Sequence, residues 1–422
     1  MQALLDINGF YANAELVFDP KIRGRPVVVL TNNDGCICAV NQAAKDAGVG
    51  KKFVPYFQVK EDLQRVNAVV RSSNYELYAD MSRRFMDTCS RFAPNSHIYS
   101  IDECFLDFGS SHSAPPEGWD AYGRYMRRTV WKEVRLPIGV GIGPTPTLAK
   151  AASHAAKRIE GFNGVAVIDS DHVRRSILSQ MELTDVWGIG RRLAARLELL
   201  GVKNAWQLAE CDPGWIRKQF SVLVESTVYE LKGIKKLDWD EVRAPKKEIY
   251  STRSFGQRVM DKASLRQAIL THVGIAASKL RDQNSLSGHM VVFGANSPHD
   301  NAPYYSRSFT HKFPSYTSDT TLLSAAASRL VDQIYSRGIR FYKVGVGLLD
   351  LVREDTYQRD MFTINKDKPE LMACLDKING RYGRNSVFVA GQGVEQKFSM
   401  RREFLSKQYT TRLSDLPVIK CK

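Results

Sequence analysis

The sequence predicts a multidomain α+β protein, and three features of the chain support this class. Its 422 residues correspond to about three domains of roughly 150 residues each. The first half mixes apolar strand-like runs with helical patterns, as α+β and α/β domains do. From about residue 171 the pattern is short, helical and basic, and from residue 248 strands and helices mix again.

The charge balance favours a polyanionic partner. There are 60 Lys and Arg residues against 45 Asp and Glu, which gives a formal net charge of +15. Such an excess favours DNA or RNA first and an anionic membrane surface second, and a basic surface without a partner is the alternative.

The cysteines and the N-terminus predict a soluble cytoplasmic protein. Seven cysteines are scattered without a CxxC pair, and Cys36 and Cys38 have the wrong spacing for a zinc knuckle. This usage is typical of free thiols in a reducing cytosol. The chain shows no apolar run of signal-peptide length at its start and no stretch of the ~20 apolar residues that span a membrane.

The first half begins with a strand, MQALLDI, that ends at a turn with Asn8 and Gly9. The runs PVVVL and CICAV follow within residues 26–40, and the Asn-Asn-Asp-Gly sequence between them is a strong hairpin signal. A second hairpin is acidic, and PIGVGIG predicts a small-residue strand. Apolar residues at helical spacing predict helices over residues 41–48, 74–91, 119–134 and 147–158.

The second half contains a helical region over residues 171–235, a linker around Pro245 and a small α/β unit over residues 248–350. In this unit, strand-like runs such as HMVVFGA alternate with helical runs such as LRQAILTHVGIAASKLRDQ. Beyond Asp350 the sequence predicts a polar, broken chain with a basic tail over residues 397–420.

The acidic hairpin, 98-IYSIDECFLDF-108, carries adjacent carboxylates at Asp102 and Glu103 inside an apolar strand. On a straight strand neighbouring side chains point to opposite faces, so one acid would be buried unpaired at a cost of several kcal/mol. Either the chain turns here, so that both acids reach one site, or a cation neutralises them. A metal site at the tip of the hairpin satisfies both conditions.

Asp6 ends the first strand and supplies a third carboxylate, with the Ile7 carbonyl beside it. An all-oxygen site suits Mg²⁺ or Mn²⁺ and argues against zinc. Two such ions bind the attacking and leaving oxygens in phosphoryl transfer. The alternative is that Asp6 caps a turn and that the two hairpin acids face solvent.

Aromatic and basic residues follow these acids. Phe10 and Tyr11 stack on a nucleotide or, as their pattern alone favours, fill the core. Lys150 and Lys157 lie about two turns apart on one helix face with His154. That face fits a triphosphate near bound metal, and a solvated basic helix is the alternative.

Glycines mark two further features. Gly139, Gly141 and Gly143 do not match the dinucleotide-binding spacing, so they predict close packing. The stretch 186-VWGIGRRLAARLELLG-201 predicts a helix-hairpin-helix in which the glycines and free helical N–H groups approach a duplex phosphate, with an ordinary helical turn as the alternative. Its predicted DNA-binding residues are Gly188, Gly190, Arg191 and Arg192.

These motifs together resemble those of a known family. LDINGFYANAE, SSNYELYADMSRR, YSIDECFLDF, VGIGPTPTLAKAASHAAK and VWGIGRRLAARL stand in the order found in the Y-family, lesion-bypass DNA polymerases. The resemblance covers the whole chain. NNDGCICAVNQAAKDAGV and the tail from Phe388 to Lys420 resemble the UmuC type, the catalytic subunit of DNA polymerase V or a mobile-element-borne homologue.

The resemblance implies a right-hand polymerase with a helical thumb, an α/β little finger and a C-terminal extension. The extension would carry a clamp-binding peptide and a partner-binding tail. The implied boundaries are residues 1–10 and 74–170 for the palm, 11–73 for the fingers, 171–238 for the thumb, 246–350 for the little finger and 351–422 for the extension.

The resemblance also assigns roles to site residues. Asp6, Asp102 and Glu103 match the catalytic acids that hold two Mg²⁺ ions with the Ile7 carbonyl, and Mn²⁺ is the alternative ion. Beside Phe10, Tyr11 matches the steric gate that excludes a 2′-hydroxyl, and Lys157 matches a triphosphate contact. Lys45 and Gln42 stand where many relatives have arginine and tyrosine, and lysine lacks the bidentate fork of arginine.

The implied function is error-prone translesion synthesis on a primer-template with dNTPs, in the SOS response to DNA damage. In the peptide 358-QRDMF-362, Gln358, Met361 and Phe362 resemble a sliding-clamp contact, and the tail implies a cleaved UmuD-type dimer and a RecA filament. A catalytically inactive DNA-binding scaffold is the alternative, although its expected mark, a missing carboxylate, is not seen. A further alternative is another enzyme with the same palm, such as a nucleotidyl cyclase. The predicted helix-hairpin-helix and the basic second half argue against it, because a cyclase has no duplex to hold.

Overall fold

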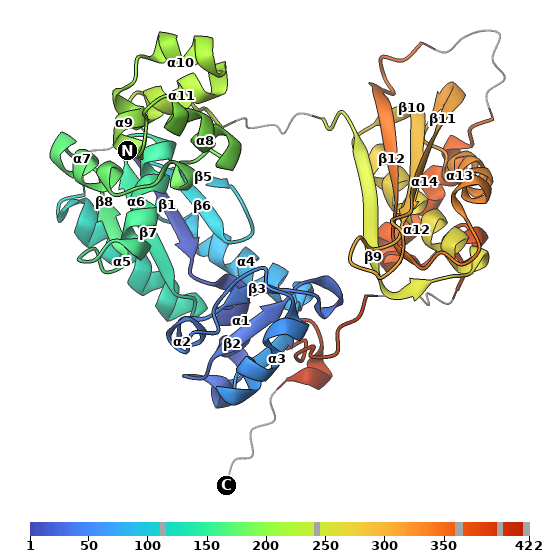
Figure 1. Ribbon diagram of the computed structural model, residues 1–422, viewed down its shortest axis with the longest axis horizontal. Helices are drawn as coiled ribbons and strands as arrows, with labels where there is room; N and C mark the ends of the chain where they lie inside the picture. The colour runs from blue at the N-terminus through green and yellow to red at the C-terminus, as the bar shows by residue number, and fades with distance from the viewer. Residues whose placement is uncertain (110–114, 240–244, 359–365, 395–399, 417–422) are drawn as a thin grey trace. The chain divides into compact units, whose positions relative to one another are not determined.

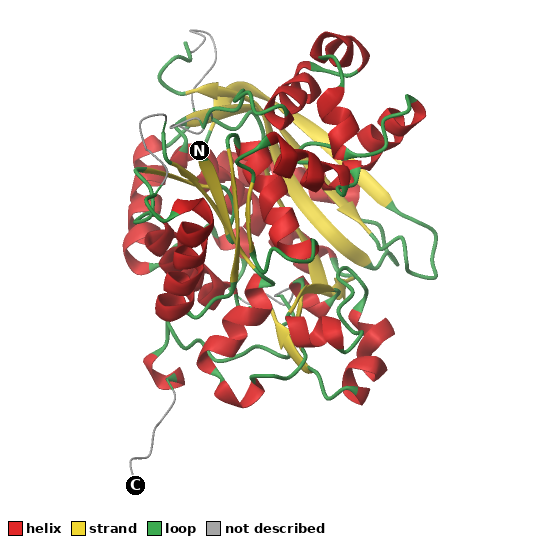
Figure 2. Cartoon of the chain, turned by 90° about the vertical axis from the view of Figure 1, so that its left-hand side faces the viewer, coloured by secondary structure: helices red, strands yellow, loops and turns green. Residues whose placement is uncertain are grey.

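The computed structural model of the chain describes residues 1–109, 115–239, 245–358, 366–394 and 400–416. The chain forms two compact units (Figure 1). Unit 1 comprises Met1–Glu241 and Arg402–Lys422, and unit 2 comprises Val242–Arg401. The chain therefore leaves unit 1 and returns to it at its C-terminal end. Both helices and strands build the molecule (Figure 2), which confirms the predicted α+β class.

A five-stranded sheet forms the centre of unit 1. Its order is β5-β6-β1-β7-β8, and every pair is antiparallel except β7 with β8. β1 is the middle strand, so the residue that follows its apolar run emerges between β6 and β7. The strands are β1 (Gln2–Ile7), β5 (Asn95–Ile98), β6 (Glu103–Asp107), β7 (Ile138–Gly143) and β8 (Val165–Val167).

Helices cover both faces of this sheet. One face contributes Leu5, Ile138 and Val140 to the main core, together with residues of α1, α4 and α5. The other face is covered by α6, which also packs against the helices that follow it. The helices are α1 (Phe10–Phe18), α4 (Tyr75–Cys89), α5 (Gly118–Val134) and α6 (Pro146–Arg158).

A smaller sheet, of order β3-β2-β4, lies at one end of unit 1 (Figure 1). The predicted hairpin is present as the antiparallel pair of β2 and β3, and β4 pairs parallel to β2 at the edge. Leu63 and Ala44 bring two helices onto it. The elements are β2 (Val27–Leu30), β3 (Ile37–Val40), β4 (Val69–Ser72), α2 (Gln42–Asp46) and α3 (Tyr56–Arg65), with the short 3₁₀ helices η1 (Pro20–Ile22) and η2 (Asn32–Asp34).

The predicted helical region is confirmed between residues 171 and 231. Its apolar side chains form one core with the outer face of α6. The elements are α7 (Asp171–Ser179), η3 (Leu183–Asp185), α8 (Arg191–Leu199), α9 (Ala205–Glu210), α10 (Pro213–Gln219) and α11 (Val222–Leu231).

Unit 2 has a four-stranded sheet of order β11-β10-β12-β9, in which every pair is antiparallel. Its two long helices pack against each other and share the core with the strands. The elements are β9 (Ile249–Val259), α12 (Lys262–Asp282), β10 (Ser285–Ala295), β11 (Ser306–Thr317), α13 (Thr320–Ile334) and β12 (Phe341–Arg353).

The chain beyond Asp350 is more regular than the sequence predicts, and that expectation is wrong. β12 continues to Arg353, and the helix α14 (Pro369–Tyr382) follows, with Met372 only 3% exposed. The Arg281 guanidinium donates to Asp376 at 2.6 and 2.8 Å, which fixes α14 on unit 2. Two short 3₁₀ helices complete the described chain, η4 (Ala390–Gln392) and η5 (Leu413–Asp415).

Within the described residues, no helix combines the length and the apolarity needed to cross a bilayer.

Candidate active site

An open pocket of about 1130 Å³ lies in unit 1, where the large sheet meets the smaller one. It is lined by every residue that the sequence analysis places in the catalytic, metal-binding and nucleotide-binding sets. These residues are Asp6, Ile7, Phe10, Tyr11, Gln42, Lys45, Asp102, Glu103 and Lys157.

The three carboxylates come together because of strand register. Asp6 at the end of β1 lies directly opposite Glu103, the first residue of β6. Asp102 stands in the turn before that strand, and its carbonyl accepts from the Ile7 N–H at 2.9 Å. The Ser100 hydroxyl donates to the Asp102 carboxylate at 2.7 Å. The chain therefore turns at the adjacent acids, which was one of the two predicted solutions to their burial.

Two lysines from α6 supply the positive charge. Lys157 Nζ lies 2.5 Å from the Asp6 carboxylate, and Lys150 Nζ lies 2.6 Å from that of Glu103. Burial raises the pKa of Asp6 above its ordinary value, and the Lys157 ammonium opposes that rise. The acids thus form a crowded, partly buried anionic group that requires cations.

In the part of the chain that the structure describes, no three His, Cys, Asp or Glu side chains are arranged as a ready metal-holding group. The donor set nevertheless fits a hard divalent cation, since the groups are carboxylate oxygens beside a backbone carbonyl. The lysine ammoniums on Asp6 and Glu103 mark the positions where these acids accept positive charge.

Glycines on β7 allow α6 to lie close to the sheet. A Cβ at Gly141 would meet the Ser153 backbone nitrogen at 2.0 Å, and one at Gly139 would meet Lys157 Cε at 2.7 Å. Side chains at these positions would push the helix away and displace Lys157 from Asp6. The predicted packing role of these glycines is confirmed.

The lining of the pocket also carries a group of cations. Burial lowers the pKa of Lys45, and the positive charges of Lys52, Arg158 and Lys157 lower it further. An anion that entered this part of the pocket would be attracted by all of these charges. Gln42 also lines the pocket, and its amide donates to Asp46 at 2.8 Å.

Sequence reasoning missed Lys52, Arg158 and Arg127, which also line the pocket. The signal for Arg158 was its place next to Lys157, at the last turn of the same helix. Arg127 comes from α5, and its guanidinium donates to the Ile138 carbonyl at 2.9 Å and to the Asn163 carbonyl at 2.6 Å. No local pattern in the sequence connects Lys52 or Arg127 with the acids.

The two aromatic residues after β1 have different environments. Phe10 is 3% exposed and belongs to the main core. Its ring therefore fills the core, which was one of the two roles that the sequence left open. Tyr11 is half-buried and stacks on Tyr78, with ring centroids 4.3 Å apart and planes 15° apart. Burial raises the pKa of Tyr11 to about 12. Gly9, the N-cap residue of α1, permits this arrangement because its φ of +52° lies in the left-handed region that glycine adopts readily.

The predicted helix-hairpin-helix is present in part. Gly188 has a φ of +88°. The N-cap residue of α8 is Gly190, and no side chain accepts a hydrogen bond from the first N–H groups of that helix at this cap. Arg191 and Arg192 are exposed at this helix start. The element before the hairpin is the 3₁₀ turn η3 rather than a full helix.

The predicted clamp peptide is only partly described. Gln358 is exposed, whereas Met361 and Phe362 lie outside the described residues.

Comparisons with family models match three parts of the chain. The impB/mucB/samB family model matches residues 5–154, and the model of that family's C-terminal domain matches residues 246–361. A domain of unknown function matches residues 369–419. This last match begins in unit 2 and ends in unit 1.

Similar proteins cover the whole chain. The protein UmuC of Salmonella typhimurium is 41% identical over 425 residues, 100% of each chain. The protein MucB of Escherichia coli is 39% identical over 426 residues, again 100% of each. DNA polymerase IV of Saccharolobus solfataricus is 30% identical over 205 residues, 47% of this chain and 56% of that protein.

The fold is that of the Y-family DNA polymerases. A solved chimera of the Y-family polymerases Dbh and Dpo4 matches with a TM-score of 0.63 and 20% identity, over 83% of this chain and 99% of the chimera. The chain belongs to the impB/mucB/samB family, as a Y-family DNA polymerase of the UmuC type. Its function is accordingly translesion DNA synthesis in SOS mutagenesis, and no comparison favours the scaffold alternative.

Proposed function

We propose that the pocket of unit 1 is the nucleotidyl-transfer site of this polymerase. The observation that carries the proposal is the juxtaposition of two opposite charges in one pocket. Three carboxylates line this pocket, and so does a group of lysines and an arginine whose positive charges act on one another. The acids suit the reacting end of a primer, and the cations suit the triphosphate of an incoming dNTP.

Homology to Y-family polymerases implies dependence on a divalent metal. We propose Mg²⁺, with Mn²⁺ as a substitute, held by the Asp6, Asp102 and Glu103 carboxylates and the Ile7 carbonyl. When bound, such ions favour ionisation of the primer 3′-hydroxyl and neutralise the charge on the departing pyrophosphate.

The remaining groups of the site bind and orient. The Ser100 hydroxyl fixes one oxygen of Asp102, which holds that carboxylate at the hairpin tip. The Lys157 ammonium, 2.5 Å from the Asp6 carboxylate, would be available to a phosphate oxygen if a metal ion took over the neutralisation of that acid. Lys45, Lys52 and Arg158, which line the same pocket, complete the phosphate-binding group. The Tyr11 ring, held by its stack on Tyr78, lies under the sugar and excludes a 2′-hydroxyl.

Replacing Lys157 by alanine is expected to raise the KM for dNTP by roughly tenfold, because the variant cannot form one charge-assisted hydrogen bond to a phosphate. Steady-state primer extension over a range of dNTP concentrations measures this change. Lys132→Ala is the matched control, since Lys132 is an exposed lysine on α5. An unchanged KM in the Lys157 variant would exclude the phosphate-binding role.

Replacing both Arg191 and Arg192 by alanine is expected to weaken primer-template binding equally for all sequences. The reason is that a hairpin and helix start recognise phosphates rather than bases. The slope of log affinity against log salt should fall by about 1 for each DNA phosphate that the variant no longer neutralises. Fluorescence anisotropy at several salt concentrations measures both effects, and a sequence-dependent weakening would contradict backbone recognition.

We propose the partners that the relatives suggest. One solved relative is described as a ternary complex, and its substrates support primer-template and dNTP binding here. The UmuC resemblance supports a cleaved UmuD-type dimer, and beyond it we propose a RecA filament and a sliding clamp, the last through residues 358–362. The net charge of +15 supports action on DNA, and we propose that this action takes place in the cytoplasm.

The experiment that tests the function is Mg²⁺-dependent primer extension on an abasic-site template, with and without the UmuD-type dimer and the RecA filament. Extension by the chain alone would show a self-sufficient bypass polymerase. Extension only with the partners would show a catalytic subunit that requires assembly. No extension under either condition would refute the proposed site.

A further inference from the structure

The end of the chain docks on unit 1 as an extended segment. We call residues 402–416 the docked tail. From residue 401 to 408 its side chains alternate between exposed and half-buried, with Arg402, Phe404 and Ser406 on the inner side. This period of two is typical of a strand lying on a surface. The tail therefore presents one regular face to the rest of unit 1.

One part of that face meets the edge of the smaller sheet. β4 is an edge strand, and its last residue, Ser72, donates its N–H to the Phe404 carbonyl at 3.0 Å. The Phe404 N–H donates in turn to the Ser72 hydroxyl at 2.9 Å. The Phe404 ring contacts Tyr56 edge to face, with centroids 5.6 Å apart. The docked tail thus pairs with a backbone N–H of the edge strand, a kind of group that such a strand leaves unpaired.

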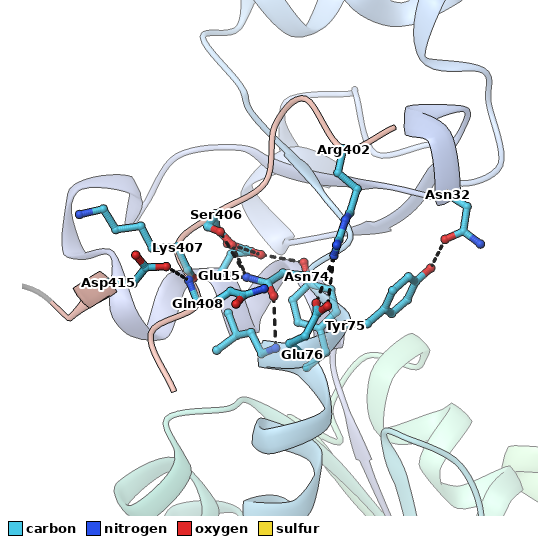
Figure 3. Close-up of polar contacts among 12 residues, drawn as sticks. Glu15, Asn32, Asn74, Tyr75, Glu76, Arg402, Ser406, Lys407, Gln408 and Asp415 are labelled. Atoms are coloured by element: carbon cyan, nitrogen blue, oxygen red, sulfur yellow. Dashed lines mark hydrogen bonds and ion pairs between the residues drawn. The ribbon is translucent and has the colours of Figure 1, made fainter. Parts of the chain in front are cut away.

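The other part meets the start of α4 (Figure 3). Arg402 forms an ion pair with Glu76 at 3.1 Å. The Asn74 amide donates to the Ser406 hydroxyl at 2.9 Å, while its carbonyl oxygen accepts from Leu77 N–H and caps α4. Asn74 is fully buried, so the capping residue of the helix and the tail form one buried polar contact.

Beneath this contact lies a buried carboxylate. Glu15 of α1 is 1% exposed. Its Oε1 accepts from the Tyr78 hydroxyl at 2.7 Å and from the Ser406 hydroxyl at 3.0 Å, and Arg71 lies 3.7 Å from its other oxygen. Burial raises the pKa of Glu15, and both hydroxyls oppose that rise. A carboxyl this deep depends on each of its few donors.

We propose that Ser406 is a positioning residue for the ring of Tyr11. It acts through the Glu15 carboxylate, which holds the hydroxyl of Tyr78, and the Tyr78 ring is the surface on which Tyr11 stacks. The far end of the chain thereby takes part in discrimination between sugars. This inference rests on the proposed role of Tyr11 as the sugar gate.

Replacing Ser406 by alanine in the full-length chain is expected to lower the preference for dNTP over rNTP by about three- to tenfold. The Glu15 carboxylate loses one of its donors, so Tyr78 is held less firmly and the gate above it yields to a 2′-hydroxyl. The measurement is kcat/KM for a matched rNTP and dNTP pair. A purely structural role would lower both values equally and leave their ratio unchanged.

Ser414→Ala is the matched control, because Ser414 is an exposed serine of the same tail. A double-mutant cycle with Tyr78→Phe tests the route, since both variants act on Glu15 and their effects on the ratio should not add. Tyr11→Ala is measured in parallel. If it shifts the ratio and Ser406→Ala does not, the inference on the tail is overturned while the gate stands. If neither shifts it, the gate role itself is refuted.

Discussion

Replacing Asp102 by alanine is expected to reduce nucleotide incorporation on the order of 10⁴-fold and to leave primer-template binding nearly unchanged. Asp102 is the carboxylate at the hairpin tip, held by Ser100 and opposite the end of β1. Its removal takes an oxygen ligand from the proposed metal site, whereas the basic hairpin before α8 is untouched. Single-turnover extension and fluorescence anisotropy measure the two quantities separately.

Asp120→Ala is the matched control, because this aspartate is 58% exposed on α5. Asp120→Ala should retain full incorporation. Appreciable turnover by the Asp102 variant would show that the pocket is not the reaction site, and a parallel loss of DNA binding would show that the substitution had unfolded unit 1.

Replacing Tyr11 by alanine is expected to raise incorporation of ribonucleotides relative to deoxyribonucleotides by roughly 10- to 200-fold, the range that steric discrimination in a pocket supplies. The Tyr11 ring is fixed from below by Tyr78 and at its edge by Tyr75. Truncation to alanine opens the space that a 2′-hydroxyl needs. Competitive extension with matched rNTP and dNTP mixtures measures the ratio.

Tyr11→Phe separates the ring from its hydroxyl. The phenyl ring retains the bulk and the stacking surface, so this variant should discriminate as well as the native chain. Unchanged sugar selectivity in the alanine variant would rule out the gate, and loss of selectivity in the phenylalanine variant would assign the discrimination to the hydroxyl instead.

The sequence predicted the parts of the site that depend on local chain direction. An Asx-Gly turn ends β1, and two adjacent acids mark the place where the second hairpin bends. Such signals act within a few residues, so the pairing of Asp6 with Glu103 required only that these two strands be neighbours. The helix face with Lys157 was equally readable, because its period of 3.6 residues is local.

The parts that escaped prediction depend on contacts between distant segments. Lys52 reaches the pocket through the packing of a loop, and the Tyr78 ring lies under Tyr11 only because α4 crosses α1. β11 has few apolar residues and was not predicted, although pairing with β10 orders it. The helix α14 was missed because its apolar positions are few, and Met372 is its main buried anchor.

Docking of residues 402–416 on unit 1 has a topological consequence. Unit 2 is joined to unit 1 by two chain crossings, one after residue 239 and one before residue 402, so the polypeptide closes a loop between the units. A second connection lowers the conformational entropy of unit 2 and gives the docked tail an effective concentration on the order of millimolar at its contact surface on unit 1. A protein that captured residues 402–416 would leave unit 2 joined to unit 1 by a single chain crossing.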